Sequence, residues 1–303
     1  MRGGLLWRGL LLLMMSAFAS AGLAHSNPIL RVAYAGSMGV VMDEALGPAF
    51  ARTHTLRYEG IGQGSYALAR LLAAHQMRTD VFVCITPGPM RVLKHAGLVT
   101  SAVPIASTQM VVVYSPHSRY AADFERAAHS DKPWYEVLRE PGLRFGRTDP
   151  AVDPQGASLL LTLQLAAKYY HVAGLMQAIA GPAENPAQIF AEPSLLSRLE
   201  AGQIDATLGY LSAAESRHLP SITLPDEINL TDPALQSTWY RRAAVKLADG
   251  KTLHAQPLVF YAAVPRDAPQ TALAQAFIEF LLSAPGQALL RNHGYSAPHG
   301  GNL

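Results

Sequence analysis

The sequence predicts an α/β fold with mainly parallel sheets, for three reasons. Short apolar runs rich in β-branched and aromatic residues alternate with segments of helical periodicity along most of the chain. The 303 residues are enough to bury a sizeable core, as one large domain or as two lobes. No Pro/Gly/Ser-rich linker and no internal repeat interrupts the pattern, so two lobes would have to be connected through strands.

The predicted elements follow one another in a regular order. Strands are expected at residues 30–36, 55–60, 80–84, 109–115, 143–147, 205–210 and 257–264. Helices are expected at residues 39–52, 66–75, 87–96, 155–170, 194–201 and 270–283. The stretch "LADGKTLH" (247–254) has an Asp-Gly step between alternating flanks, which predicts a hairpin. Cys84, the single cysteine, lies in the strand pattern "DVFVCITP" and is expected to be a core residue.

Residues 1–24 have the organisation of a secretory signal peptide. Arg2 and Arg8 precede an apolar run from Leu10 to Phe18, and small residues suited to cleavage follow. We therefore expect a periplasmic protein; an uncleaved anchor is the alternative. Cleavage removes two arginines and no acid, so the mature chain has a net charge near zero. A neutral chain without basic runs argues against a nucleic-acid or membrane surface, and no nucleic acid is expected as a partner.

Ser37 and Ser65 each follow a predicted strand and begin a predicted helix. In "AGSMG" and "GQGSYALARLL" the glycines let the backbone approach a ligand, and we place both serines at helix N-cap positions. The first N–H groups of a helix lack internal partners and lie at the positive end of its dipole. Two such turns facing one cleft would bind a small oxyanion. Capping without any ligand is the alternative for each turn alone.

Two further residues could complete such a site. In "GRTDPAVDPQG" Asp153 precedes a proline and a long predicted helix, and in "AGQIDATLGY" Tyr210 ends a predicted strand. The phenol of Tyr210 could donate to an anion, although a tyrosine there also suits packing, and Asp153 also suits a helix cap. The 11 histidines show no metal-ligand spacing, so we expect no site for a free metal cation and no cofactor.

As a set, these motifs resemble the periplasmic molybdate/tungstate-binding proteins of ABC transporters, closest to the tungstate- or archaeal-type branch. The stretches "YAGSMG", "GQGSYALARLL", "DVFV", "GRTDPAVDPQG", "AGQIDATLGY" and "LPDEINLTDP" have the order and spacing of that family, over nearly the whole mature chain. The resemblance implies a two-lobed type II periplasmic binding protein fold. It also implies that the protein binds molybdate or tungstate and delivers it to a membrane permease. We expect a monomer with lobe I at residues 25–107 and 255–303 and lobe II at residues 108–254.

The resemblance also implies roles for single residues. In that family the serines of the two Gly-Ser turns contact the oxyanion, and they match Ser37 and Ser65 here; an aspartate and a tyrosine match Asp153 and Tyr210. A closely related branch has a glutamate one residue before the tyrosine, which completes an expanded coordination of the metal together with the aspartate. Gly209 occupies that position here. This difference favours a tetrahedral oxyanion held by hydrogen bonds and leaves Asp153 as a possible ligand to the oxyanion metal, because a carboxylate otherwise repels a dianion unless it is protonated.

Two other functions remain open. The same fold could bind sulfate, phosphate or a small organic acid; Asp153 could accept the proton of phosphate, and Arg147 could pair with a carboxylate or form a surface or interlobe salt bridge. A secreted serine hydrolase would use Ser37 in a relaxed nucleophile elbow, with His293 or His299 completing a triad. Against the hydrolase, only one strand precedes Ser37, no oxyanion-hole loop lies upstream, and the second Gly-Ser turn has no role. We therefore expect a binding protein and no enzyme.

Overall fold

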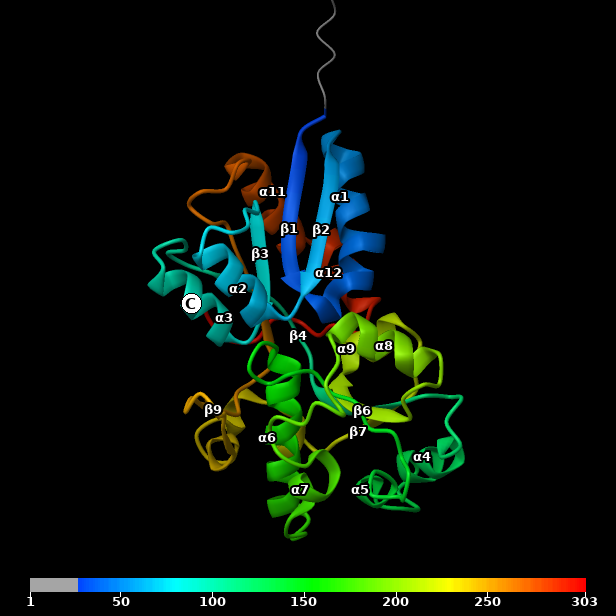
Figure 1. Cartoon of the computed structure of the whole chain (residues 1–303). Coiled ribbons are helices and arrows are strands. Elements are labelled where there is room, and N and C mark those ends of the chain that lie inside the picture. Colours follow the sequence, from blue (N-terminus) through cyan, green and yellow to red (C-terminus); the bar gives the residue numbers. More distant parts are fainter. Residues whose placement is uncertain (1–26) are drawn as a thin grey trace, which may run out of the picture.

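The computed structural model describes residues 27–303, so the predicted signal peptide lies outside the described residues. Two lobes stand one above the other in Figure 1, and the chain passes from the upper lobe I to the lower lobe II and back. Residues 108–109 join the last strand of the first lobe I segment to lobe II, and residues 255–258 lead back. The predicted lobe boundaries at 107/108 and 254/255 coincide with these connections, and we retain them as a proposal.

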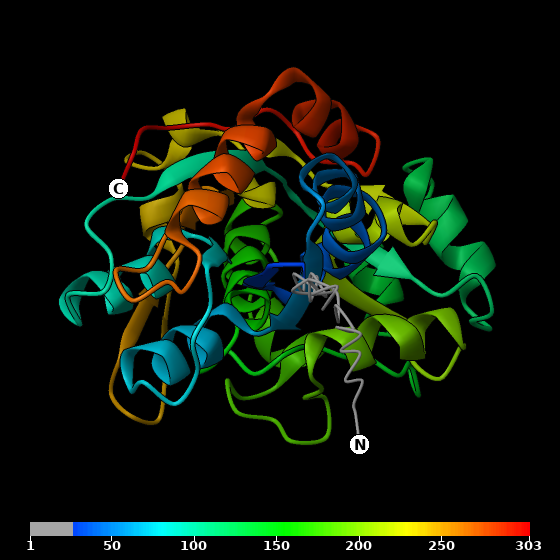
Figure 2. The same ribbon diagram turned by 90° about the horizontal axis from the view of Figure 1, so that it is seen from above.

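Lobe I is built on a five-stranded sheet. In spatial order its strands are β2 (Arg57–Gln63), β1 (Ile29–Ala35), β3 (Val81–Ile85), β10 (Val259–Ala263) and β4 (Val103–Ser107). Its helices are α1 (Gly47–His54), α2 (Ser65–Ala73), α3 (Pro87–His95), α11 (Thr271–Leu282) and α12 (Ala284–Arg291). Helices α2 and α3 lie on the opposite side of the sheet from α11 and α12 (Figure 2), so β3 is buried at every position. Cys84 is accordingly a core residue, as predicted.

Lobe II has a three-stranded sheet in the order β6 (Ala206–Tyr210), β5 (Met110–Tyr114) and β7 (Ser221–Thr223). Its helices are α4 (Ala121–Ala128), α5 (Trp134–Val137), α6 (Pro154–Tyr169), α7 (Leu175–Ala180), α8 (Glu192–Glu200), α9 (Leu211–Ser216) and α10 (Asp226–Asn229). Strands β8 (Ala244–Lys246) and β9 (Thr252–His254) form a separate hairpin. Its turn contains Gly250 at φ +83°, which confirms the predicted Asp-Gly hairpin.

Four short helices complete the described elements. Three are 3-10 helices, η1 (Gly36–Met38), η3 (Pro233–Leu235) and η4 (Tyr240–Arg242). The fourth, η2 (Val41–Leu46), is a π-helix that leads directly into α1. The predicted helix at 39–52 therefore forms, with a wider first turn than an α-helix has.

One central strand in each sheet runs against its neighbours. In lobe I, β1 is parallel to β2 and β3, whereas β10 is antiparallel to both β3 and β4. In lobe II, β5 is antiparallel to β6 and β7. Four of the five lobe I strands and two of the three lobe II strands run in one direction, as the prediction of mainly parallel sheets requires. The prediction is wrong for hydrogen-bonded pairs, because in these two sheets only β1–β2 and β1–β3 pair in parallel. The physical reason is the topology: β5 and β10 carry the chain from one lobe into the other, so they are not part of the repeating strand–helix units that impose one direction.

Other differences from the prediction occur at the sheet edges. The predicted strand at 143–147 contributes only isolated bridges, from Phe145 to Ala206 and from Arg147 to Ile189. Strands β4 and β7, which the prediction lacks, are both edge strands. Pro104 in β4 fits such a place, because an edge strand can tolerate a residue without an N–H group. The prediction also lacks α4 and the short helices α5, α7, α9 and α10.

The C-terminal segment packs along lobe I. Helices α11 and α12 are bent by 62° relative to each other, and no single helix in residues 27–303 is long and apolar enough to cross a membrane. Beyond α12, Ser107 and Ser296 exchange two backbone hydrogen bonds of 3.0 and 2.9 Å. Ala102 and Leu303 exchange two more, of 3.2 and 2.9 Å. The last residues thus occupy the outer side of β4.

Candidate ligand-binding site

The two serine turns lie side by side at one edge of the lobe I sheet. Strands β1 and β2 are parallel, and their register pairs Ala35 with Gln63. Ser37 and Ser65 each lie two positions beyond these paired residues, so the two turns leave the sheet together. Both side chains are buried, with 4% of Ser37 and 1% of Ser65 exposed. The structure therefore brings together the two serines that the sequence analysis selected.

Neither serine acts as a helix cap. The N-cap residues are Ala35 for η1 and Gly64 for α2, and neither helix has a side-chain cap, so the expected N-cap positions of Ser37 and Ser65 are wrong. The Oγ atoms of both serines are buried and have no hydrogen-bond partner among residues 27–303. A buried hydroxyl without a partner costs about 1–3 kcal/mol. Capping does not account for these two hydroxyls, whereas contact with a polar ligand does.

Lobe II contributes Asp153 and Tyr210. Asp153 is the N-cap of α6 and accepts a 2.9 Å hydrogen bond from the backbone N–H of Gln155. Burial raises the pKa of the Asp153 carboxyl to about 6; the Gln155 amide opposes this rise, and Asp149 adds to it. Tyr210 ends β6, and its phenolic oxygen is also buried without a partner in the described part of the chain. Both of these predicted residues thus lie at the ends of elements that point towards lobe I.

The lobes touch at Gly64. A Cβ atom at this position would lie 2.8 Å from the carbonyl oxygen of Val152 and 3.2 Å from Oδ2 of Asp153, so only glycine allows lobe II to approach this closely. Further along α2, Ala67 donates a 3.3 Å backbone hydrogen bond to the same Val152 carbonyl, and Arg70 donates to the carbonyl of Ala151 at 2.9 Å. These contacts hold Asp153 against the Ser65 turn.

A second carboxyl group, which the sequence analysis missed, belongs to this site. Glu192 is the first residue of α8 and is only 5% exposed. Its Oε2 lies 3.0 Å from the place that a Cβ of Gly36 would occupy, so it contacts the Ser37 turn. Burial raises the pKa of Glu192 well above its usual value and Asp153 raises it further, while the Ser37 amide and Arg217 oppose the rise. The sequence offers no signal for this role, because an acid in the first turn of a helix is ordinarily explained by the helix dipole.

Three hydroxyls and two carboxyls therefore meet where the lobes join. Burial raises the pKa of the Tyr210 phenol far above its usual value, and the charges of Asp153 and Glu192 add to this effect. The same two carboxyl residues line a cavity of about 600 Å³, whose lining includes none of the three hydroxyl residues. Hydroxyl donors beside the first N–H groups of α2 suit a small oxyanion. Residues 27–303 contain no group of three or more His, Cys, Asp or Glu side chains placed to hold a metal ion.

The arrangement does not support a serine nucleophile. Such a serine needs a base hydrogen-bonded to its hydroxyl, but Ser37 Oγ has no partner of any kind within the described residues. His293 places its Nδ1 2.8 Å from the carbonyl oxygen of Leu289, and His299 uses its backbone N–H to donate to Ser107. Neither histidine hydrogen-bonds to the Ser37 hydroxyl within the described residues, so no base for a triad is in place there.

Arg147 lies inside lobe II and, within the described residues, does not form the surface or interlobe salt bridge that is one of its expected roles. Its side chain is fully buried in lobe II, where it donates hydrogen bonds to the carbonyl oxygens of Pro182 (2.9 Å) and Ala183 (2.8 Å). Burial lowers the pKa of its guanidinium, and Asp149 opposes this effect. The residue holds the loop between α7 and α8 in place and forms no salt bridge within residues 27–303, while its Nη1 is buried without a hydrogen-bond partner among them.

Comparison with known families agrees with this architecture. Residues 30–296 match the model of a family described as bacterial extracellular solute-binding protein. The chain belongs to this family. The resemblance and the two-lobed α/β fold that the sequence analysis predicted are thereby confirmed.

Curated relatives of this solute-binding protein carry names that refer to metal oxyanions. The molybdate/tungstate-binding protein WtpA of Pyrococcus abyssi is 33% identical over 209 residues, which cover 62% of this chain and 60% of the relative. A Haloferax volcanii protein named as a molybdenum-binding protein of an ABC transporter is 30% identical over 272 residues, 88% of this chain and 82% of the relative. The chain spans about 60% of the length of the first curated relatives that it matches.

Solved structures of low sequence identity share the fold of this solute-binding protein. The periplasmic molybdate-binding protein of Azotobacter vinelandii superposes with a TM-score of 0.61 at 14% identity, covering 89% of this chain and all of that one. The sulfate-binding protein SubI of Mycobacterium tuberculosis superposes with a TM-score of 0.54 at 16% identity, covering 89% of this chain and 87% of that one. At these identities the likeness concerns the fold alone.

Proposed function

We propose that this protein captures molybdate or tungstate between its lobes and delivers it to the permease of an ABC transporter. The observation that carries the proposal is the set of three buried hydroxyls without partners, on Ser37, Ser65 and Tyr210, which come from both lobes and meet at one place. A tetrahedral oxyanion offers acceptors in several directions and could satisfy all three. The names of the curated relatives support this ligand class, and the predicted signal peptide supports a periplasmic location. The protein acts as a monomer in this proposal.

Capture in this scheme depends on lobe closure. Ser37 and Ser65 belong to lobe I, and Asp153, Glu192 and Tyr210 belong to lobe II, so a ligand that contacts both sets binds the closed form better than the open one. Such a ligand shifts the population towards the closed form by its difference in affinity for the two. The closed form would then be the one that the permease recognises.

The two carboxyls favour a metal oxyanion over sulfate. Carboxylates repel a dianion unless they are protonated or bond directly to its central atom. Molybdenum and tungsten can accept additional oxygen ligands, whereas the sulfur of sulfate does not. Gly209 cannot provide the family's glutamate, and a Cβ there would lie 3.3 Å from Val113, within the sheet. We propose that Glu192 supplies the second carboxyl in its place, from the start of α8, and that Asp153 is the other ligand to the metal. This proposal replaces the expectation, drawn from Gly209, of a tetrahedral oxyanion held by hydrogen bonds alone.

Isothermal titration of the mature chain, residues 25–303, with molybdate, tungstate, sulfate and phosphate tests the function. We expect tight binding of molybdate or tungstate and a weak response to sulfate. Binding of sulfate or phosphate alone would mean that one of these anions is the ligand. Asp153 and Glu192 would then be protonated beside sulfate, or would accept the proton of phosphate. No response to any of the four anions would contradict the proposal and direct the search to small organic acids.

A variant of the second carboxyl tests its role. Glu192→Gln keeps the size of the side chain and removes its ability to act as an anionic ligand. We expect the affinity for molybdate or tungstate to fall by about tenfold or more, that is by about 1.4 kcal/mol or more, because the metal loses an anionic oxygen ligand. We also expect the preference for molybdate or tungstate over sulfate to become smaller. Glu279→Gln, on an exposed position of α11, is the matched control. Equal affinities for Glu192→Gln and the control would remove Glu192 from the site.

A further inference from the structure

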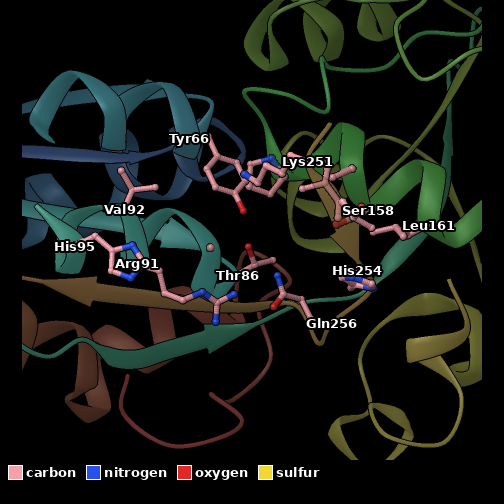
Figure 3. A pocket seen from close by; sticks show the side chains of 15 residues that line it. Tyr66, Thr86, Arg91, Val92, His95, Ser158, Leu161, Lys251, His254 and Gln256 are labelled. Atoms are coloured by element: carbon pink, nitrogen blue, oxygen red, sulfur yellow. The ribbon is translucent and has the colours of Figure 1, made fainter. Parts of the chain in front are cut away.

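A second pocket between the lobes is lined by basic side chains. It has a volume of about 360 Å³ and no aspartate or glutamate among its lining residues. Figure 3 shows Tyr66, Thr86 and Arg91 on the lobe I side, from α2 and the start of α3, facing Ser158 and Lys251 of lobe II. We call this cavity the outer pocket.

Two cations face the outer pocket without an acidic partner. Neither Arg91 nor Lys251 forms a salt bridge within residues 27–303. The Nζ atom of Lys251 lies 4.3 Å from the centroid of the Tyr66 ring, across the boundary between the lobes. Burial lowers the pKa of Lys251, and Arg70 and Arg91 lower it further, against an opposing effect of Asp249. Like charges thus crowd together here, and a bound anion would reduce their repulsion.

Thr86 adds a strained backbone and a free hydroxyl to the same pocket. Its φ is +65°, a left-handed conformation that a β-branched residue rarely adopts and that concentrates at ligand sites. The Thr86 N–H donates a 2.9 Å hydrogen bond to the carbonyl of Val259, which fixes this conformation. The side chain is 4% exposed and lies in the pocket (Figure 3). Thr86 is the N-cap residue of the nine-residue helix α3, yet its hydroxyl makes no capping hydrogen bond.

The outer pocket adjoins the site formed by Ser37, Ser65, Asp153, Glu192 and Tyr210, which we call the buried site. Tyr66 and Pro154 line it, and they directly follow the site residues at the starts of α2 and α6. Ser158, one turn into α6, also lines the pocket and lies near enough to the Tyr210 phenol to oppose the rise in its pKa. The buried site itself carries two carboxyl groups, which repel an approaching anion whenever they are ionised. Basic side chains outside the buried site would add a long-range attraction for the anion.

We propose that the outer pocket is a second anion-binding subsite, in which Arg91, Lys251 and the Thr86 hydroxyl hold a small divalent oxyanion before it moves to the buried site. This inference rests on the proposed function for the identity of the anion, but not for the existence of the subsite. In this proposal the anion moves past Ser158 and Tyr66, which line the pocket beside the buried site. The subsite accelerates capture by raising the local concentration of the anion, while the buried site sets the final affinity.

A titration that bypasses the buried site tests the subsite directly. In isotope-labelled protein carrying Ser37→Ala and Ser65→Ala, sodium sulfate is added at constant ionic strength, and the Nε–H resonance of Arg91 is followed. We expect a saturable shift that Lys251→Gln abolishes, and no such shift for Arg139, an exposed arginine of lobe II outside the pocket. A shift at Arg91 no larger than that at Arg139 overturns the proposal. This result does not depend on whether the native chain captures molybdate, so the two proposals can fail separately.

Association kinetics test the consequence for capture. The double variant Arg91→Gln/Lys251→Gln removes two positive charges from the pocket, one on α3 and one in the β8–β9 hairpin. Its control, Lys94→Gln/Lys246→Gln, removes two positive charges from exposed positions of the same helix and hairpin that do not line the pocket. In stopped-flow measurements with molybdate at low ionic strength, we expect the pocket variant to associate about tenfold more slowly than the control, and the difference to shrink at high salt. Equal association rates for the two variants would refute a role of the subsite in capture.

Discussion

Ser37→Ala should weaken oxyanion binding strongly, because it removes a hydrogen-bond donor from a fully enclosed site. Ser37 is 4% exposed, so water cannot replace the lost hydroxyl in the closed protein. A hydrogen bond to a charged group contributes about 1.5–3 kcal/mol. At about 1.4 kcal/mol per factor of ten, the dissociation constant should rise by about 10- to 150-fold. Isothermal titration with molybdate measures this change.

The same substitution should not destabilise the ligand-free protein. The Ser37 hydroxyl has no partner in the described part of the chain, so its loss relieves a desolvation cost, and the free energy of unfolding should stay equal or rise by about 1 kcal/mol. Urea denaturation without ligand measures this. Thr162→Val is the matched control, since Thr162 also has a buried hydroxyl without a partner but lies about 13 Å along α6 from Asp153; it should leave affinity unchanged.

Two results would refute this reasoning. Unchanged affinity in Ser37→Ala would show that the hydroxyl does not contact the ligand. A loss of about 1 kcal/mol or more in the stability of the ligand-free protein would show that the hydroxyl acts as a helix cap after all. Loss of affinity together with retained stability is the combination that only a ligand contact produces.

Two further predictions concern closure and pH. Gly64→Ala should weaken oxyanion binding by about tenfold or more, because its methyl group would lie 2.8 Å from the backbone carbonyl oxygen of Val152 and oppose the closed form. Gly39→Ala, whose methyl group would meet open space, should leave the affinity unchanged. Isothermal titration of both variants measures the difference. Burial raises the folded-state pKa of Asp153 to about 6 from its ordinary 3.8, so the folded chain binds more protons than the unfolded one between these values. The stability of the ligand-free protein should therefore fall as the pH rises from about 4 to 6, by an amount on the order of 2–3 kcal/mol. Asp153→Asn keeps the helix cap and should reduce this dependence, leaving the part that comes from Glu192, whose pKa burial also raises. Asp232→Asn, which alters another capping aspartate, should leave the pH profile unchanged; thermal melts over a series of pH values measure both effects.

The sequence predicts the interior of the fold better than its margins. Strands β1, β3, β5, β6 and β10 are mostly apolar because helices cover the sheets, and such runs are easily found in a sequence. Strands β4 and β7 lie at edges, where a proline or a three-residue length is tolerated and the apolar signal is weak. The reversed direction of β5 and β10 depends on how the chain passes between lobes, which no local pattern records.

The candidate site divides in the same way. Ser37, Ser65 and Asp153 lie at the junctions of strands, turns and helices, and such junctions have local signatures of glycine, proline and small polar residues. Glu192 has no such signature. Its proximity to Asp153 arises only when α8 packs against the Ser37 turn, and its buried carboxyl becomes unusual only in that tertiary setting. Gly209 occupies the family's glutamate position, within a sheet beside Val113, and the carboxyl that we propose in its place comes from another element, α8.

The pairing of residues 296–303 with β4 has a consequence for the resistance of the protein to aggregation. An open sheet edge is a template on which other chains can assemble into aggregates. Ser296 and Leu303 occupy that edge by bonding to Ser107 and Ala102, so the tail acts as an intramolecular guard against intermolecular strand addition. Removing residues 296–303, or attaching a bulky fusion directly after Leu303, would therefore threaten solubility more than ligand affinity.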